Sequence, residues 1–135
     1  MRRRLRASPR AKAAPDEPAR ILVIEDQRLA RLALHLILEL DGYHVRVAGD
    51  GHRAIKVMRA FRPCLIIMDW RLPGLFGEEL CREIRSTDPD VPIIIVSASD
   101  EAFSSNVAAS ARLRKPIDVR QLRAVVGSHV SPPVR

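Results

Sequence analysis

The sequence predicts an α/β protein built on a doubly wound sheet of five parallel strands. Short apolar runs recur along the chain with helical patterns between them, and this alternation is typical of parallel sheets. Three of the runs are apolar at nearly every position, as strands covered on both faces must be. Acidic residues directly follow two of these runs. The five runs lie at 21–24, 43–47, 64–68, 93–96 and 112–114.

Strand composition predicts the order of the strands in the sheet. The runs at 21–24, 64–68 and 93–96 are the central strands. The run at 43–47 alternates polar and apolar residues, and the short run at 112–114 is basic, so both suit sheet edges. Right-handed crossovers then give the order 2-1-3-4-5, the flavodoxin-like arrangement. In this order the first and third strands are neighbours.

Helices are predicted between these strands, at 27–40, 51–61, 77–85 and 118–126. In the first helix, a stripe at helical spacing is assigned to the core; it consists of Leu29, Leu32, Ala33, Leu36, Ile37 and Leu40. Leu34 and Leu38 lie off this stripe and are predicted to form an exposed apolar edge, either without a role or for docking. Only 17 residues separate Ser97 from Lys115. The fourth helix is therefore predicted to be short or irregular, near 101–109.

Length and charge limit the number of domains and the kind of partner. The 135 residues suffice for one domain with a substantial core. The formal net charge is +7, but residues 1–20 carry a net +5, which leaves about +2 for the rest. The domain itself is therefore not expected to bind nucleic acid. Cys64 and Cys81 lack metal-ligand spacing and are expected to be reduced thiols.

The two ends of the chain lack apolar periodicity. Residues 1–19 are predicted to form a disordered basic arm, 20–127 the folded domain and 128–135 a short flexible tail. Weak contact with nucleic acid or an anionic surface is expected only through the arm. No stretch approaches the roughly 18 apolar residues of a membrane span. We expect a cytoplasmic protein, with an organellar transit peptide at 1–14 as the alternative.

Five polar side chains are predicted to converge at the carboxyl edge of the sheet, where open α/β sheets bind ligands. Glu25 and Asp26 follow the first strand, and Asp69 follows the third. Three neighbouring carboxylates repel one another unless a cation lies between them, and their hard oxygens suit Mg²⁺. Ser97 and Lys115 follow the last two strands and supply a hydroxyl and an ammonium. Phosphoryl transfer to a metal-bound carboxylate requires such groups.

These motifs resemble those of the receiver domains of two-component response regulators. They are Glu25-Asp26, Asp69 with Leu72-Pro73 and Gly77 beyond it, Ser97-Ala98 and Lys115-Pro116. The resemblance implies that Asp69 accepts a phosphoryl group from a phosphohistidine of a histidine kinase or histidine phosphotransfer protein. It further implies that Ser97 and Lys115 bind the phosphoryl oxygens and that the peptide bond between Lys115 and Pro116 is cis.

The resemblance also implies a set of Mg²⁺ ligands. Asp26, Asp69 and the backbone carbonyl of Arg71 would bind the metal directly, and Glu25 would act partly through water. Taken singly, each of these residues has a structural explanation, such as an acid in the first turn of a helix. Their occurrence together, each at a strand end and in the family's order, favours the functional interpretation.

One position departs from the family pattern. Receivers usually carry an aromatic residue three positions before the lysine, where this chain has Arg112. Phosphorylation is therefore expected to reorganise the short fourth-helix segment rather than to flip an aromatic ring. The face formed by the short helix near 101–109, the strand at 112–114 and the helix at 118–126 would suit an acidic downstream protein or a homodimer. It offers four arginines, Arg112, Arg114, Arg120 and Arg123. The kinase is expected at the Leu34 and Leu38 edge.

We expect a stand-alone receiver that relays the phosphoryl group or regulates a partner by direct binding. It would be a Mg²⁺-dependent phosphoacceptor with slow self-dephosphorylation rather than a turnover enzyme. One alternative is a degenerate receiver that binds proteins independently of phosphorylation, although its site residues are intact. Another is a metal-dependent phosphohydrolase with Asp69 as nucleophile. Such hydrolases typically have a second acid two residues later, where this chain has Arg71.

Overall fold

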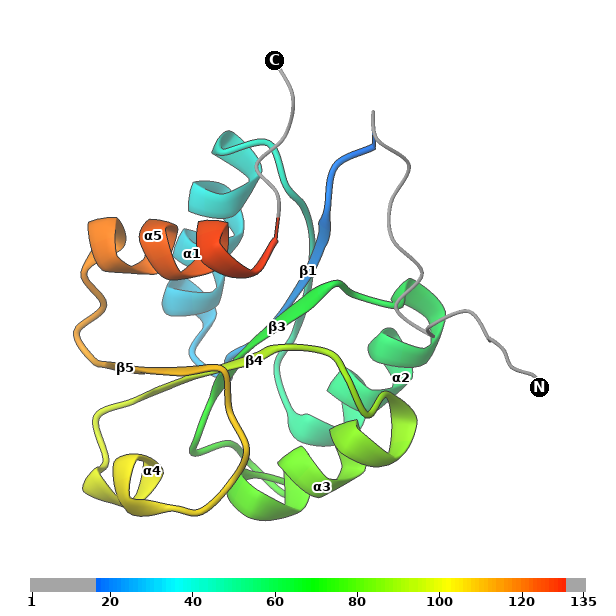
Figure 1. Cartoon of the computed structure of the whole chain (residues 1–135), viewed down its shortest axis with the longest axis vertical. Helices are drawn as coiled ribbons and strands as arrows, with labels where there is room; N and C mark the ends of the chain where they lie inside the picture. Colours follow the sequence, from blue (N-terminus) through cyan, green and yellow to red (C-terminus); the bar gives the residue numbers. More distant parts are fainter. Residues whose placement is uncertain (1–16, 131–135) are drawn as a thin grey trace.

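The computed structural model describes residues 17–130, which form a five-stranded parallel sheet with helices on both faces (Figure 1). The strand order is β2-β1-β3-β4-β5, as predicted. The strands are β1 (Arg20–Ile24), β2 (His44–Ala48), β3 (Leu65–Asp69), β4 (Ile93–Ser97) and β5 (Ala111–Arg114). Most of the predicted basic arm and the last five residues of the predicted tail lie outside the described residues.

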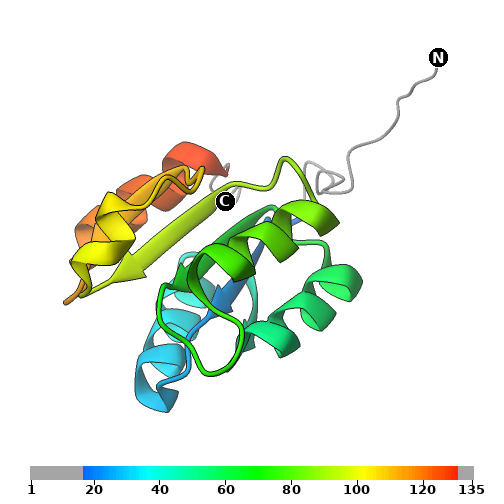
Figure 2. The same cartoon turned by 90° about the horizontal axis from the view of Figure 1, so that it is seen from below.

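Five helices connect and follow the strands, with α2 and α3 side by side on one face of the sheet (Figures 1 and 2). They are α1 (Arg28–Leu40), α2 (Gly51–Phe61), α3 (Gly77–Thr87), α4 (Asp100–Ser104) and α5 (Val119–His129). Helix α5 extends beyond its predicted end at residue 126, and Val130, the residue that follows the helix, is buried. Among residues 17–130, none of the helices has the length and apolar character of a membrane span.

Alternate residues of the central strands face two separate cores. Leu22, Ile66 and Ile93 point to the face covered by α2, α3 and α4. Ile21 and Ile67 point to the opposite face, which α1 and α5 cover. Because strand side chains alternate with a period of two, apolar residues are needed at every position. The central strands β1, β3 and β4 meet this requirement.

The predicted orientation of α1 is wrong. Leu34 and Leu38, expected at the surface, are buried with 6% and 0% exposure. The predicted core stripe is instead largely exposed: Leu29 is 79%, Leu32 50%, Leu36 53% and Leu40 78% exposed. Apolar residues occur all round this helix, so their spacing alone does not select the buried face.

The buried face of α1 is marked by a charged residue. Arg31 lies three positions before Leu34 and seven before Leu38, so all three share one side of the helix. Its guanidinium donates to the backbone carbonyls of Glu25 and Asp26, at 3.1 and 3.5 Å. These bonds fix the first turns of α1 against the end of β1, with the two leucines turned towards the sheet.

The fourth helix is short, as predicted, and occupies only Asp100–Ser104. Ser99 caps its first turn by accepting a hydrogen bond from the backbone N–H of Glu101, 3.2 Å away. Residues 105–110 then run without regular secondary structure into β5. The helix therefore covers the start of the predicted segment at 101–109, and the rest of that segment is irregular.

Candidate functional site

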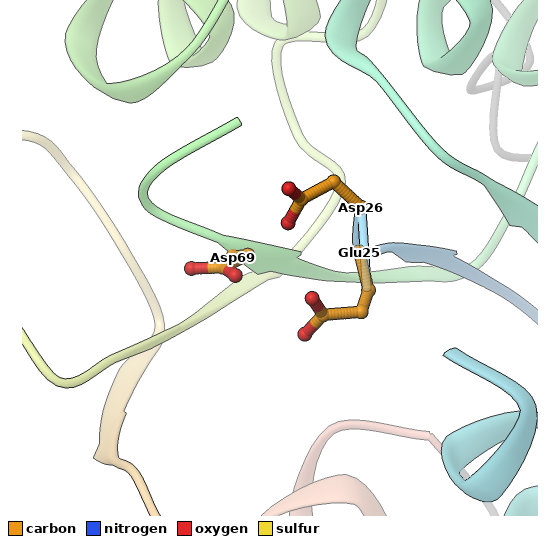
Figure 3. Close-up of side chains that lie close together, drawn as sticks. All are labelled: Glu25, Asp26 and Asp69. Atoms are coloured by element: carbon orange, nitrogen blue, oxygen red, sulfur yellow. The ribbon is translucent and has the colours of Figure 1, made fainter. Parts of the chain in front are cut away.

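Three carboxylates meet at the carboxyl edge of the sheet (Figure 3). Glu25 and Asp26 follow β1, and Asp69 is the last residue of β3. Strands β1 and β3 pair in parallel with Ile24 opposite Met68, so their ends are adjacent. One oxygen from each carboxylate lies within 4.8 Å of the others. Glu25 and Asp69 are buried, whereas Asp26 is exposed.

Lys115 connects two of these carboxylates. Its Nζ lies 3.0 Å from Glu25 Oε1 and 2.9 Å from Asp69 Oδ2. The residue follows β5, and its backbone N–H donates to the carbonyl of Ser97 at 3.0 Å. The peptide bond between Lys115 and Pro116 is cis, which confirms the expectation. The sequence thus correctly placed a cation beside Asp69.

The surroundings shift the pKa values of two groups in this cluster. Burial raises the pKa of Glu25, and the neighbouring charge of Asp69 acts in the same direction. Burial alone would lower the pKa of Lys115, but hydrogen bonds to Asp69 and Glu25 outweigh it, so the pKa of Lys115 is raised. Lys115 is therefore a fixed positive charge at neutral pH, and the charge on Glu25 is held at an energetic cost.

Ser97 lies at the same edge, at the end of β4. Asp69 pairs with Val96 in the β3–β4 register, so Ser97 is one residue further along the neighbouring strand. The side chain is buried, and Oγ accepts a hydrogen bond from the backbone N–H of Ser99 at 2.9 Å. Its hydroxyl proton can still be donated to another acceptor.

The loop after β3 is shaped around Trp70, which is buried. The backbone N–H of Gly77 donates to the carbonyl of Trp70 at 3.0 Å and closes the loop. Gly77 has a φ of +57°, and a Cβ there would lie 3.4 Å from the indole ring. Both the left-handed backbone and the close approach favour glycine at this position. The loop thereby holds Arg71 beside the carboxylate cluster.

Two arginines in the site have roles that the motif analysis did not identify. Arg31 holds the backbone after β1 through the carbonyls of Glu25 and Asp26. The Arg71 N–H donates to Asp69 Oδ1 at 3.3 Å, and its guanidinium pairs with Glu101 of α4 at 3.4 Å. The pair of Arg71 and Glu101 could not be inferred from sequence spacing, because the two residues are 30 positions apart. The role of Arg31 had no sequence signal either, because the apolar spacing in α1 does not identify the buried face.

The residues present fit a divalent cation. Three carboxylates face one ammonium, which leaves a surplus of about two negative charges when all are ionised. Carboxylate oxygens are hard ligands, and the exposed side of the cluster at Asp26 leaves room for water or phosphate oxygens. Glu25, Asp26 and Asp69 could hold such an ion.

Comparison with known proteins agrees with this geometry. The family model described as the response regulator receiver domain matches residues 21–127. Response regulator MprA of Mycolicibacterium vanbaalenii is 38% identical over 112 residues, which cover 79% of this chain and 48% of that protein. MprA of Mycobacterium avium is 38% identical over 110 residues, 78% of this chain and 48% of that protein. The chain spans about half the length of the curated relatives it matches.

Solved structures show the same fold. Response regulator TrrA of Thermotoga maritima, in complex with Mg²⁺ and BeF, has a TM-score of 0.77 and 30% identity, covering 83% of this chain and 99% of that chain. The receiver domain of sensor histidine kinase PA1611 of Pseudomonas aeruginosa, with a magnesium ion in its active-site cleft, has a TM-score of 0.75 and 28% identity, covering 83% and 97%. Sequence motifs, sheet topology and site geometry thus agree, and the chain belongs to the response regulator receiver domain family.

Proposed function

We propose that Asp69 accepts a phosphoryl group from the phosphohistidine of a histidine kinase or phosphotransfer protein in a Mg²⁺-dependent reaction. The observation that carries this proposal is the environment of the Asp69 carboxylate. One of its oxygens accepts from Lys115 Nζ at 2.9 Å and the other from the Arg71 N–H at 3.3 Å. The carboxylate is therefore oriented by two donors at the edge of the sheet, beside a candidate metal site.

The transfer exchanges a P–N bond for a P–O bond. A carboxylate oxygen of Asp69 attacks phosphorus, the bond to the imidazole breaks, and the ring, protonated on its other nitrogen, leaves as neutral imidazole. Lys115 stabilises the charge on the phosphoryl oxygens, and Ser97 donates its hydroxyl proton to one of them. Bound Mg²⁺, held by Glu25, Asp26, Asp69 and the Arg71 carbonyl, would supply further positive charge.

We propose a phosphoacceptor with slow self-dephosphorylation rather than a turnover enzyme. Hydrolases with an aspartate nucleophile typically use a second acid two residues later. Here that residue is Arg71, whose guanidinium pairs with Glu101 and is directed towards α4. The degenerate receiver remains the alternative, but an oriented Asp69 with its lysine and acidic neighbours supports phosphorylation. This chemistry suits the cytoplasm, where kinases obtain phosphoryl groups from ATP.

The kinase or phosphotransfer partner is proposed to dock on the exposed leucine face of α1. This face replaces the buried Leu34 and Leu38 edge and consists of Leu29, Leu32, Leu36 and Leu40. Helix α1 begins at Arg28, two residues after Asp26, so a protein whose histidine approaches Asp69 passes its first turn. A helical bundle with an apolar groove has the chemistry to cover this face.

The face of α4, β5 and α5 is proposed to carry the output, by relay, partner binding or homodimer formation. Its arginines are less available than their sequence positions suggest. Arg114 pairs with Asp100 at 3.2 Å and Arg123 with Asp41 at 2.8 Å. Arg112 is directed to backbone carbonyls. Arg120 remains exposed and is the first residue of this set to replace when an acidic partner is tested.

Phosphorylation by a phosphorylated kinase, or by acetyl phosphate, tests the proposal. The wild type should be labelled in the presence of Mg²⁺ and not after chelation, and Asp69→Asn should abolish labelling. Asp90→Asn is the matched control, because Asp90 is exposed in the loop before β4, at the opposite edge of the sheet. Labelling that persists in Asp69→Asn would exclude Asp69 as the acceptor.

A further inference from the structure

The position usually aromatic in receivers is occupied by an arginine that hydrogen-bonds to the α4 segment. Arg112 lies on β5 opposite Ile95 and is half-buried. Its Nε donates to the carbonyl of Ala102 at 3.0 Å. Its Nη2 donates to the carbonyls of Ser105 at 3.3 Å and Val107 at 2.6 Å. One guanidinium thus bonds three backbone oxygens, one within α4 and two in the segment that follows it.

These bonds explain how α4 can end so early. The last carbonyls of any helix lack partners in the following turn, and in a helix of five residues nearly all carbonyls are in this position. Ala102 is fully buried, so an unbonded carbonyl there would be costly. Arg112 supplies the shorter of two bonds to this carbonyl, at 3.0 Å against 3.5 Å from the Ser105 hydroxyl, and its charge is favourable at a helix C-terminus.

The opposite end of α4 is bonded to the phosphorylation site. Ser97 Oγ accepts from the Ser99 N–H at 2.9 Å, and Ser99 Oγ in turn caps the helix. A turn of the Ser97 hydroxyl towards a phosphoryl group on Asp69 changes the bond to Ser99 and displaces the start of α4. Arg112, at the other end of the same five-residue helix, opposes that displacement.

We propose that Arg112 is a positioning residue that holds α4 in its resting arrangement and thereby restrains the response of Ser97 to phosphorylation of Asp69. This inference rests on the proposed function. The three carbonyl bonds are made in the structure described, and displacement of α4 loses or lengthens some of them. A group that stabilises one state more than another shifts the equilibrium towards that state. Removing the guanidinium therefore favours the phosphorylated arrangement.

The restraint can be measured as the affinity of the protein for beryllofluoride with Mg²⁺, which is a stable mimic of a phosphoryl group on aspartate. Arg112→Gln keeps one amide donor and should bind the mimic roughly three- to tenfold more tightly than the wild type, the change expected for the net loss of one ordinary hydrogen bond from the resting arrangement. Arg112→Lys keeps the charge without the planar fork and should show a smaller increase. Arg59→Gln, at an exposed arginine on α2, should leave the affinity unchanged.

Hydrogen exchange distinguishes positioning from general stabilisation. In the wild type, the mimic should accelerate exchange of the backbone amides at 105–109. In Arg112→Gln these amides should exchange rapidly without the mimic, while the central strands keep their protection. Equal or weaker binding of the mimic by both Arg112 variants, or the same change in Arg59→Gln, would overturn the inference. A wild type that does not bind the mimic would instead contradict the proposed function itself.

Discussion

In the absence of metal, the ammonium of Lys115 compensates the negative charge of two carboxylates in the cluster. This ammonium lies about 3 Å from both buried carboxylates, whereas Asp26 is exposed to solvent. One ammonium compensates two buried negative charges only in part, so Glu25 keeps a raised pKa despite this contact. Such a cluster lowers stability in exchange for cation binding, as functional sites commonly do.

Neutralising Glu25 should stabilise the metal-free fold. Glu25→Gln removes the buried charge and keeps one acceptor oxygen, which preserves one of two bonds, because Lys115 and the backbone N–H of Gln27 donate to different oxygens of Glu25. We expect the free energy of unfolding at pH 7 to rise by about 1 kcal/mol, measured by urea denaturation with a chelator present.

The pH dependence of this effect has a definite sign. Because the folded-state pKa of Glu25 is raised, the folded protein holds that proton more tightly than the unfolded chain does. The stability penalty is complete above the folded pKa and disappears as the pH falls towards the unfolded value of 4.5. The advantage of Glu25→Gln should shrink over this interval. The stabilisation that accompanies the raised pKa of Lys115 is fully present below the unfolded value of 10.5 and is lost only at higher pH, so it stays constant over this interval. A pH-independent advantage would contradict this explanation.

Helix α1 shows where a sequence pattern is insufficient. Its thirteen residues offer two competing apolar stripes, and the stripe with more leucines is the exposed one. The deciding contact is Arg31 with the carbonyls after β1, a tertiary hydrogen bond that no hydrophobic pattern reports. In α4, by contrast, chain length alone was decisive, because 17 residues between Ser97 and Lys115 leave no room for a long helix.

The exposed leucine face of α1 predicts a graded effect on phosphotransfer. Leu29→Ser, in the first turn beside Asp26, should slow transfer from a phosphorylated kinase more than Leu40→Ser at the far end, about 16 Å away along the helix. Both side chains are nearly 80% exposed, so neither change should alter stability by more than about 0.5 kcal/mol. Labelling by acetyl phosphate, which needs no docking, should be unchanged in both.

Leu38→Ala is the contrasting variant for α1. Leu38 is fully buried, so its truncation should lower the free energy of unfolding by about 2–5 kcal/mol. The folded fraction should still accept the phosphoryl group from the kinase at the wild-type rate. Equal phosphotransfer by wild type and Leu29→Ser, together with a defect in Leu38→Ala, would place the docking surface elsewhere.

At the scale of the whole molecule, the sheet topology could be predicted from the sequence, because a few physical requirements determine it. Strands covered on both faces must be apolar throughout, which identified β1, β3 and β4, and right-handed crossovers then gave the strand order. That order brought Asp69 beside Glu25 and Asp26 without reference to any side-chain contact. The coupling of Arg112 to Ala102 was not predictable, because it depends on the three-dimensional path of an irregular segment.

Metal binding should couple the site to the stability of the entire domain. An ion that binds only the folded state raises the free energy of unfolding, by about 1.4 kcal/mol at tenfold its dissociation constant. We expect Mg²⁺ to raise the melting temperature at constant ionic strength and Asp26→Asn to abolish most of this increase. Asp26 is an exposed carboxylate of the cluster, so its replacement should leave the fold intact. The control Asp90→Asn should retain the full increase, and a Mg²⁺ effect of equal size in both variants would exclude Asp26 as a ligand.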